Sequence, residues 1–466
     1  MEIISVEKIN EVFMHVTSSE DIEQQIKDTF TYEYPGARYT PQFKKRIWDG
    51  KVCLYHTQRK VLYLGLLGEL QQFANKFQYQ IEYKNEVISK PNNCSFEEIN
   101  QYVNSLKIAS KDNLLDVRDY QLEAIHKGLF HKRIVLLSPT GSGKSLIIYA
   151  MMRWLTEQGL KVIIVVPTTT LVEQLYSDFQ DYSSINKWSV EDHCQKLYYG
   201  FPKKFDRNIL ISTWQSIYKQ PKEWFQQFNA IIGDEAHQFK AKSLTTIMER
   251  LINVEYKIGT TGSVDNKKLN HLILQGIFGA IHKVVSTKQL QDKGQLANLE
   301  ITRLVLEHSD DMQPMDINQE IDFLIKNQRR NKFIVNLADQ CKGNTLILFQ
   351  YVEKHGNVLY ELLKSKITNR PIYYIHGQTE VSTREKIRKI LSSDKIVLTF
   401  GDHEITIQYD EDVRMIDQSI KKGETITTED NICPQWVYLK MQQQNNMNLM
   451  SNMNIRTTLE EFCNET

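Results

Sequence analysis

The segment that decides the fold is Ser138-Pro-Thr-Gly-Ser-Gly-Lys-Ser145, which follows the apolar run Ile134-Val-Leu-Leu137 directly. It opens a second apolar stretch with helical character, Leu146-Ile-Ile-Tyr-Ala-Met-Met152. Gly141 and Gly143 let the backbone bend so that its amides point at phosphate oxygens, and the N-terminus of the helix adds positive potential there. The order of strand, loop and helix predicts a phosphate-binding loop, although Ser138 replaces the first glycine of the strict pattern. The simpler alternative is a glycine-rich turn.

Two residues at the end of this loop are expected to carry its chemistry. Lys144 should reach the β- and γ-phosphates of a nucleoside triphosphate, and Ser145 should ligate Mg²⁺. The preceding residues complete the expected nucleotide-binding segment: Thr140, Gly141, Ser142 and Gly143.

A pair of acids completes the expected site. The apolar run Ala230-Ile-Ile-Gly233 ends in Asp-Glu-Ala-His237. An apolar strand that delivers two acids at its carboxyl end suits a Mg²⁺-dependent phosphohydrolase. Asp234 should hold the ion through water, and Glu235 should act as general base on the attacking water. His237 is expected to sense the γ-phosphate and to link it to a second domain. Alone, the same residues could be the charged start of a helix.

The length of 466 residues predicts two to four domains, and the pattern of apolar residues changes along the chain. Short, wholly apolar runs separated by amphipathic helices indicate a parallel sheet that is covered on both faces. One set of such runs includes Val162-Ile-Ile-Val-Val166 and Ile209-Leu-Ile-Ser212, and a second set begins at Thr345-Leu-Ile-Leu-Phe349. The predicted fold class is therefore α/β, with two parallel-sheet units in tandem after a small α+β domain. The expected boundaries are 1–108, 109–285, 286–401 and 402–466.

The N-terminal segment interleaves aromatic and basic residues between Tyr34 and Lys51. Lys44, Lys45 and Arg46 could pair with phosphates, while Tyr39, Phe43 or Trp48 could stack on bases. The alternative is that Phe43 and Trp48 belong to a core and that the cations form a solvated rim. Both interpretations stay open at this point.

Charge is balanced overall, with 57 basic and 57 acidic residues. From Asp402 to the end, however, 12 acidic residues stand against five basic ones, a net charge of −7, so the first 401 residues carry +7. A modest excess of this kind suits a polyanionic partner. The longest apolar runs are too short for a membrane span, and six scattered cysteines fit a reducing, cytoplasmic location.

The chain resembles the superfamily-2 helicases of the DEAH type, because Asp-Glu-Ala-His follows the loop and further motifs come in the usual order. The resemblance implies that Arg118 and Gln121 read adenine and that Thr261 and Ser263 couple hydrolysis to movement. It also implies that two groups of residues contact the sugar–phosphate backbone of DNA. These are Pro167, Thr168 and Thr169, and Thr213, Trp214 and Gln215.

Within that superfamily, about residues 1–400 resemble the UvsW family of phage recombination helicases. The matching stretches include Arg46-Ile-Trp-Asp-Gly50, Gln220-Pro-Lys-Glu-Trp-Phe225 and Ile396-Val-Leu-Thr399. The family implies RecA-like motor domains and ATP-driven unwinding, branch migration and annealing in recombination, repair and replication. Its implied partners are branched or single-stranded DNA, RNA–DNA hybrids, and phage recombination and single-strand-binding proteins in the host cytoplasm.

The resemblance fails after Phe400. Thr345–Tyr351 resembles motif IV, but the later motifs are missing, and no Gly-Arg dipeptide occurs anywhere in the chain. The arginine finger that such a motif supplies is worth about 10³–10⁵ in rate. The gene could be interrupted after Thr399 or Phe400, or the tail could be a small domain of another kind. The alternative function is a non-motor ATP- and DNA-binding subunit, or a fragment of a split helicase. A nuclease subunit ranks last, because no metal–carboxylate cluster is visible.

Overall fold

The computed structural model describes residues 2–87, 91–186, 188–198, 205–265, 267–296, 304–306, 316–341, 344–391 and 398–401. The acidic tail 402–466 lies outside these ranges, as do the positions where the missing motifs were expected. Contacts divide the chain into two compact units, Met1–Leu290 and Gln291–Thr466. None of the helices in the described ranges has the length and apolar character needed to cross a membrane.

The first unit begins with a small α+β module on a four-stranded sheet in the order β5-β2-β1-β6. Its strands are β1 (Ile3–Lys8), β2 (Phe13–Thr17), β5 (Val61–Tyr63) and β6 (Gln80–Tyr83). β2 is antiparallel to β1 and β5, whereas β6 is parallel to β1. Alternate residues of β1 and β2 are buried, as the period of two in a strand requires. Helices α1 (Glu20–Thr29) and α3 (Leu67–Phe77) belong to this module.

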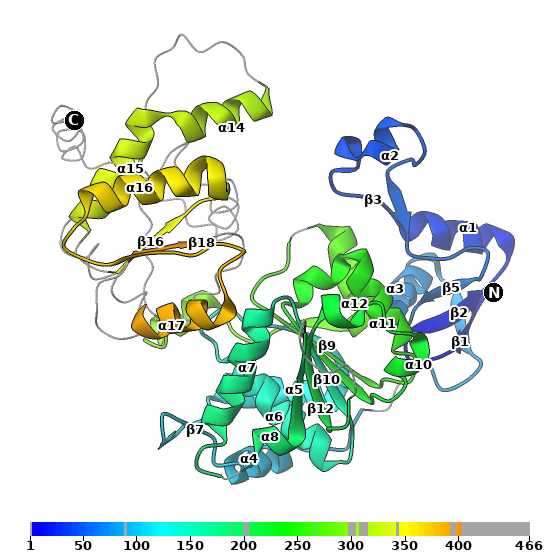
Figure 1. The fold of residues 1–466 in the computed structure, drawn as a ribbon. Helices are drawn as coiled ribbons and strands as arrows, with labels where there is room; N and C mark the ends of the chain where they lie inside the picture. The colour runs from blue at the N-terminus through cyan, green and yellow to red at the C-terminus, as the bar shows by residue number, and fades with distance from the viewer. Residues whose placement is uncertain are drawn as a thin grey trace. The chain divides into compact units, whose positions relative to one another are not determined.

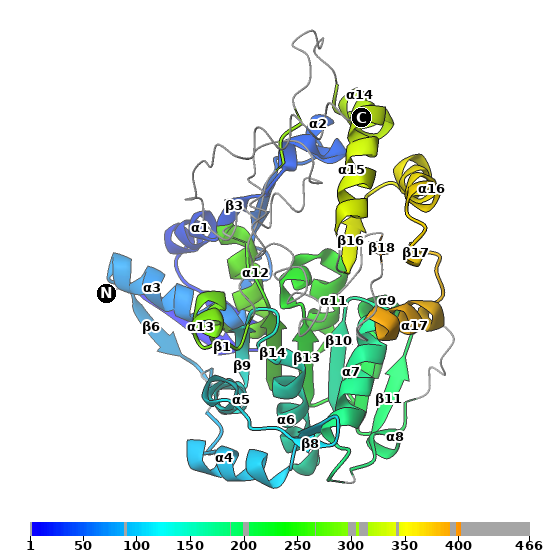
Figure 2. The same ribbon diagram turned by 90° about the vertical axis from the view of Figure 1, so that its left-hand side faces the viewer.

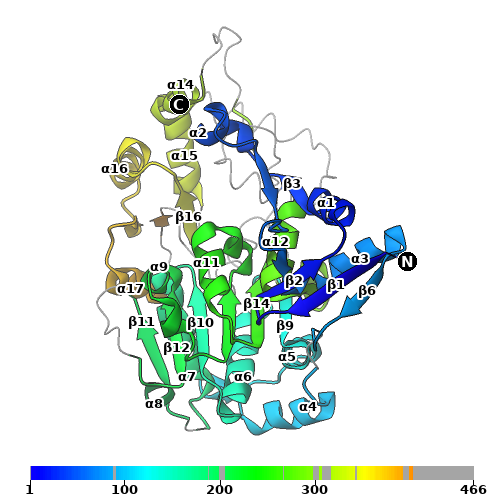
Figure 3. The same ribbon diagram turned by 90° about the vertical axis from the view of Figure 1, so that its right-hand side faces the viewer.

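A two-stranded antiparallel ribbon stands away from that sheet, with α2 at its far end in Figures 1 to 3. It consists of β3 (Thr31–Glu33) and β4 (Lys51–Cys53). Between the strands, the chain forms the 3₁₀ turn η1 (Ala37–Tyr39) and the short helix α2 (Pro41–Lys44). The basic and aromatic segment of the sequence is therefore a projection from the module.

The centre of the first unit is a seven-stranded parallel sheet in the order β11-β12-β10-β13-β14-β9-β15. The strands are β9 (Arg133–Leu137), β10 (Val162–Val166), β11 (Cys194–Leu197), β12 (Ile209–Thr213), β13 (Ala230–Asp234), β14 (Tyr256–Thr261) and β15 (Ala280–Lys283). The side chains of β10 are all buried, which explains why its sequence is wholly apolar. The predicted parallel sheet is confirmed.

Helices cover both faces of this sheet (Figure 2). One face packs against α5 (Asp119–His131), α6 (Lys144–Glu157) and α7 (Thr169–Tyr182). The other packs against α9 (Trp214–Ile217), α10 (Lys222–Phe225), α11 (Lys242–Arg250) and α12 (Lys268–Phe278). The remaining elements are α4 (Phe96–Ser105), β7 (Ala109–Ser110), β8 (Asn113–Leu114), α8 (Val190–His193), η3 (Ala236–Lys240) and α13 (Thr287–Asp292).

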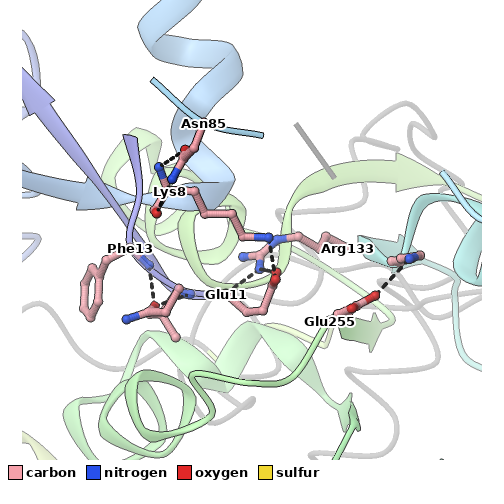
Figure 4. Close-up of polar contacts among 9 residues, drawn as sticks. Lys8, Glu11, Phe13, Asn85, Arg133 and Glu255 are labelled. Atoms are coloured by element: carbon pink, nitrogen blue, oxygen red, sulfur yellow. Dashed lines mark hydrogen bonds and ion pairs between the residues drawn. The ribbon is translucent and has the colours of Figure 1, made fainter. Parts of the chain in front are cut away.

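The N-terminal module is packed closely against the large sheet and against α12. Leu269 and Leu272 of α12 belong to the core of the module. The 3₁₀ turn η2 (Leu64–Leu66) approaches α12 so closely that a Cβ on Gly65 would lie 2.0 Å from the carbonyl oxygen of Gln275. A polar contact is added by Glu11, which lies beside Arg133 of β9 in Figure 4.

The second unit contains a three-stranded parallel sheet in the order β16-β18-β17. Its strands are β16 (Thr345–Leu348), β17 (Ile372–Tyr374) and β18 (Leu398–Gly401). Its helices are α14 (Ile317–Lys326), α15 (Gln328–Gln340), the π-helix η4 (Val352–Gly356), α16 (Asn357–Lys366) and α17 (Val381–Leu391). The second α/β unit is thus confirmed, with strand ends within one residue of the expected ones for β16.

Candidate functional site

The predicted phosphate loop connects β9 to α6 and has the backbone that its glycines allow. Gly141 and Gly143 both lie in the left-handed region, at φ values of +79° and +82°. The loop is closed internally, because the Ser142 hydroxyl donates to the Pro139 carbonyl at 2.6 Å and lies 2.6 Å from the Ser138 hydroxyl. Ser138, which replaces a glycine of the strict pattern, therefore braces the turn.

The residues expected to read adenine are tied to this loop. The Gln121 side-chain amide donates to the Ser142 carbonyl at 2.9 Å and accepts from the Arg118 backbone N–H at 3.0 Å. Tyr120 donates to the same carbonyl at 3.0 Å and accepts from the Arg118 guanidinium at 2.9 Å. The start of α5 thus contacts the phosphate loop through two hydrogen bonds to the Ser142 carbonyl, and Arg118 positions both donors.

The acids expected to act on the nucleotide lie at the same edge of the sheet as the loop. β14 lies between β13 and β9, and all three strands are parallel, so their carboxyl ends meet at one edge. The residue after β14, Gly262, faces the loop, because a Cβ there would lie 3.6 Å from the Thr140 hydroxyl and 3.7 Å from the Lys144 ammonium. Asp234 ends the neighbouring strand β13, and Glu235 follows it directly.

Asp234 is buried and accepts a 2.7 Å hydrogen bond from the Thr260 hydroxyl. Burial, followed by the nearby charge of Glu235, raises the pKa of Asp234, while the positive charge of Lys144 acts in the opposite direction. The effect of Lys144 on Asp234 means that the loop and the acids share one electrostatic site. Glu235 itself has a left-handed backbone, at φ +50°, which is unusual for this residue type.

His237 connects the acids to the strand that follows the site. Its Nδ1 lies 3.2 Å from a carboxylate oxygen of Glu235 and 2.9 Å from the Thr261 hydroxyl. That hydroxyl donates onward to the Ser263 carbonyl at 2.9 Å. The residues predicted for γ-phosphate sensing, His237, and for coupling, Thr261 and Ser263, therefore form one continuous chain of contacts that begins at Glu235, the predicted general base.

The donors expected for Mg²⁺ fit a hard cation, because Asp234 and Ser145 offer carboxylate and hydroxyl oxygens. A divalent cation would also lower the electrostatic cost of two neighbouring carboxylates, one of them buried. The Ser145 hydroxyl lies 2.8 Å from the Tyr182 hydroxyl. The described residues contain no group of three or more His, Cys, Asp or Glu side chains that could hold a metal. The other ligands would then be phosphate oxygens and water.

The two segments expected to touch the DNA backbone lie side by side at the same edge of the sheet. They follow the parallel strands β10 and β12, and the Gln215 amide donates to the Pro167 carbonyl at 3.4 Å. Two of their hydroxyls already have partners, since Thr168 caps α7 and Thr213 lies 2.9 Å from the Ser216 hydroxyl. The groups that these two segments can still offer to a DNA backbone are their backbone amides, including those of Thr169 and Trp214, and the exposed side chain of Gln215.

The basic candidates of the N-terminal module lie apart from these segments, on the projection between β3 and β4. Lys44, Lys45 and Arg46 are exposed. Trp48 is half-buried, packs edge-on against Tyr34 at 5.6 Å, and donates its indole N–H to the Lys51 carbonyl at 2.8 Å. The large side chains that are most exposed here are Tyr39, at 83%, and Ile47, at 74%.

Sequence reasoning assigned no role to Tyr120, Thr260 or Tyr182. Tyr120 and Thr260 lie inside motifs that had been identified, so their position next to Gln121 and Thr261 was the available signal. Tyr182 ends α7, 37 positions after Ser145, and only the packing of α6 on α7 brings the two hydroxyls together. No pattern in the sequence marks that contact.

Comparisons with known proteins place most of the chain in one family of helicases. The family described as DNA helicase UvsW, N-terminal, matches residues 4–84, and the family described as Type III restriction enzyme, res subunit, matches residues 114–265. The ATP-dependent DNA helicase uvsW of Enterobacteria phage T4 is 31% identical over 407 residues, which are 84% of this chain and 79% of the T4 protein.

Solved structures of the T4 helicase also match. One crystal structure is 31% identical with a TM-score of 0.55 and covers 60% of this chain and 99% of the T4 chain. A second is 27% identical with a TM-score of 0.56 and covers 91% of this chain and 89% of the T4 chain. The resemblance inferred from the motifs is confirmed, and the chain belongs to the UvsW family of superfamily-2 helicases as an ATP-dependent DNA helicase.

Proposed function

We propose that the loop around Lys144 and the acids Asp234 and Glu235 form one Mg²⁺–ATP hydrolysis site that drives movement along branched DNA. One observation carries this proposal. The loop after β9 and the end of β13 share an edge of the sheet, where the charge of Lys144 acts on Asp234. In this proposal Lys144 offsets negative charge on the phosphates, and Glu235 takes the proton of the attacking water. Mg²⁺, held by Asp234 and Ser145, would neutralise phosphate charge when bound.

Adenine recognition is proposed for Gln121 and Arg118. Both ends of the Gln121 amide are engaged with the protein, at Ser142 and Arg118. A base that hydrogen-bonds to Gln121 would therefore compete with, or add to, a contact that shapes the phosphate loop. This arrangement favours a site in which the base and the phosphates are sensed together.

Coupling is proposed for the contacts that run from Glu235 through His237 and Thr261 to Ser263. Glu235 is proposed to act on the water that attacks the γ-phosphate, and His237 Nδ1 lies 3.2 Å from its carboxylate. A change in charge at the γ-phosphate would therefore alter the hydrogen bonding of His237 first. The chain of contacts ends just before α12, the helix on which the N-terminal module packs. Hydrolysis would then be transmitted toward the N-terminal module.

The DNA substrate is proposed to be branched, with RNA–DNA hybrids as a second class. Support comes from the N-terminal module, whose sequence matches the UvsW N-terminal family and whose projection exposes several cations. Residues 1–108 would contact the junction, and Pro167–Thr169 with Thr213–Gln215 would follow the strand backbone. Roles in phage recombination and repair, and contacts with recombination or single-strand-binding proteins in the host cytoplasm, belong to the same proposal.

A second candidate is favoured by one observation, the lack of any Gly-Arg dipeptide. Without an arginine finger, the chain would bind ATP and DNA tightly but turn ATP over about 10³–10⁵ times more slowly. The chain would then act as a binding subunit, or as one half of a split helicase.

The test is ATP hydrolysis by the purified chain with and without forked DNA, an R-loop and blunt duplex. The proposed motor requires turnover that forked DNA stimulates and that Glu235→Gln abolishes. The matched control is Glu223→Gln, which makes the same change on an exposed residue of α10 and should leave turnover intact. Tight ATP binding without turnover in the unmodified chain would favour the binding subunit instead.

A further inference from the structure

The projection between β3 and β4 exposes apolar side chains at its far end. We define the tip as residues 34–50. Tyr39 is 83% exposed and Ile47 is 74% exposed, so the two rank among the most exposed large apolar side chains of the described residues. Monomeric proteins do expose single apolar residues, but two of them on one short segment that also carries exposed charge indicate a binding surface. That second feature is present here.

Four cations lie close to these two side chains in the sequence. Arg38, Lys44, Lys45 and Arg46 are all exposed, and none of them forms an ion pair with any residue that the structure describes. Only one acid lies within the tip, Asp49, and its carboxylate accepts the backbone N–H of Lys51 at 3.0 Å. The tip therefore presents cations without ion-pair partners on the same short segment as an exposed aromatic ring, a combination that proteins use to bind single-stranded nucleic acid.

The tip is ordered before anything binds to it. Its first and last residues are joined by a hydrogen bond, in which the Tyr34 N–H donates to the Gly50 carbonyl at 2.7 Å. Inside it, Gly50 has a φ of +80°, and a Cβ there would meet Ala37 and Phe43 at 3.0 Å. Thr40 caps α2 by accepting the Phe43 N–H at 3.3 Å. A ring on a rigid support loses little conformational freedom on binding, which favours affinity.

The aromatic residues of the tip divide into two groups. Phe43 and Trp48 pack within the tip, and the indole N–H of Trp48 is already bonded to Lys51. Tyr39 takes no part in these contacts and is 83% exposed. We infer that the tip binds unpaired bases of DNA, with Tyr39 stacking on a base while Lys44, Lys45 and Arg46 hold the neighbouring phosphates.

The contact is specific for unpaired bases, because the faces of paired bases are covered within a duplex. Lysines and arginines alone would bind duplex and single strands through their phosphates. The ring of Tyr39 adds affinity only where a base face is open, as at a fork, a gap or a displaced strand. This inference rests on the proposed function, since it assigns the part of the branched substrate that the N-terminal module recognises.

The experiment measures binding of the full-length chain, without ATP, to oligo-dT and to a blunt duplex at several salt concentrations. Tyr39→Ala should weaken binding to oligo-dT about 5- to 100-fold, the range for loss of one stacked base, and change duplex binding less than twofold. Tyr39→Phe keeps the ring and should restore binding. The control is Tyr83→Ala, a tyrosine on β6 outside the tip, which should behave as the unmodified chain does.

Replacing Lys44 and Lys45 by Ala should weaken binding to both DNAs and make the salt dependence shallower, by about 0.7–0.9 in slope per lost phosphate contact. The inference is overturned if Tyr39→Ala binds oligo-dT normally, or if it loses duplex binding to the same degree. Both outcomes are independent of ATP turnover. A failure of the proposed function would instead appear as an unmodified chain without DNA-stimulated hydrolysis.

Discussion

The guanidinium of Arg133 donates a 2.5 Å hydrogen bond to the backbone carbonyl of Glu11 and lies 4.0 Å from its carboxylate (Figure 4). Glu11 comes from the N-terminal module and Arg133 from the first strand of the large sheet. Lys257 lies beside Arg133 on the neighbouring strand and is 0% exposed. Burial lowers the pKa of Arg133 to about 10 and that of Lys257 well below its ordinary value, while Glu11 opposes both shifts. The module is thus joined to the motor through buried charge.

Replacing Glu11 by Gln should destabilise the first unit strongly. The change keeps the shape of the side chain but leaves two buried cations without this carboxylate. Breaking a buried charge pair in this way costs about 3–5 kcal/mol. Urea unfolding followed by tryptophan fluorescence measures the loss.

The control is Glu255→Gln. Glu255 forms an ion pair at 2.9 Å with Lys132, the residue before Arg133 in the chain. The side chain of Glu255, however, is 57% exposed. Exposed pairs contribute about 0–1 kcal/mol. Equal losses in the free energy of unfolding for the two variants would mean that the buried charges do not stabilise the contact between the module and the large sheet.

The contact between η2 and α12 gives a second pair of variants. Gly65→Ala would place a methyl group 2.0 Å from the Gln275 carbonyl oxygen, so one of the two backbones must move. Overpacking of this kind costs about 1–3 kcal/mol. The melting temperature of the first unit should therefore fall.

Gly68→Ala tests the same chemical change three positions later. Gly68 is exposed in α3, and a Cβ there would have no atom within 4 Å. Because alanine favours helix over glycine, this variant should gain about 0.5–1 kcal/mol. If Gly65→Ala also melted higher than the unmodified chain, the close approach of η2 to α12 would be wrong.

The two ends of α6 offer a matched pair for the nucleotide site. Gly143 precedes the helix with φ +82°, and Gly159 follows it with φ +78°, so alanine is strained at both. A Cβ on Gly143 would also lie 2.2 Å from the Gln121 amide nitrogen, whereas Gly159 has open space around it. Gly143→Ala should weaken binding of a fluorescent ATP analogue about tenfold or more, because the clash must displace either Gln121 or the phosphate loop, and a loss of about 1.4 kcal/mol in binding free energy is a factor of ten.

Gly159→Ala should bind the analogue normally and lose only about 1 kcal/mol of stability. Identical affinities for the two single variants would contradict the contact between α5 and the loop.

The sequence predicted the parts of this fold that depend on local pattern. β10 ends where its apolar run ends, because a strand buried on both faces cannot include a polar residue without a partner. The loop and its acids were also predictable, since parallel strands bring their carboxyl ends to one edge. The helix after the loop begins at Lys144, two residues before the apolar stretch that predicted it, because helix geometry starts at the glycine turn.

What the sequence could not predict depends on contacts between distant segments. Glu11 and Arg133 are 122 positions apart, and neither lies in a recognisable motif. In the tip, composition identified three aromatic candidates but not which of them would be exposed. Only the packing of Phe43 against Gly50, and of Trp48 against Tyr34, separates them from Tyr39.

The second unit should lose stability in mild acid through His355, which is 6% exposed. Burial, and then the charge of Arg330 at 3.4 Å, lowers the pKa of His355 to about 4 from its ordinary value of 6.5. Between these values the unfolded chain binds a proton that the folded unit does not. Stability is therefore complete above about pH 6.5 and falls as the pH drops toward 4, by about 2 kcal/mol between pH 7 and pH 5.

His355→Gln removes the titrating group and should flatten this pH dependence, although the unit becomes less stable at pH 7. Hydrogen exchange of peptides from 352–366, compared between the two proteins at the same pH, measures the effect because intrinsic exchange rates then cancel. Peptides from the first unit serve as the internal control. Asp322, whose pKa Lys326 and Lys354 lower from 3.8, titrates below this window and cannot produce the same effect. An equal loss of protection in both proteins between pH 7 and pH 5 would show that His355 takes up its proton in the folded unit.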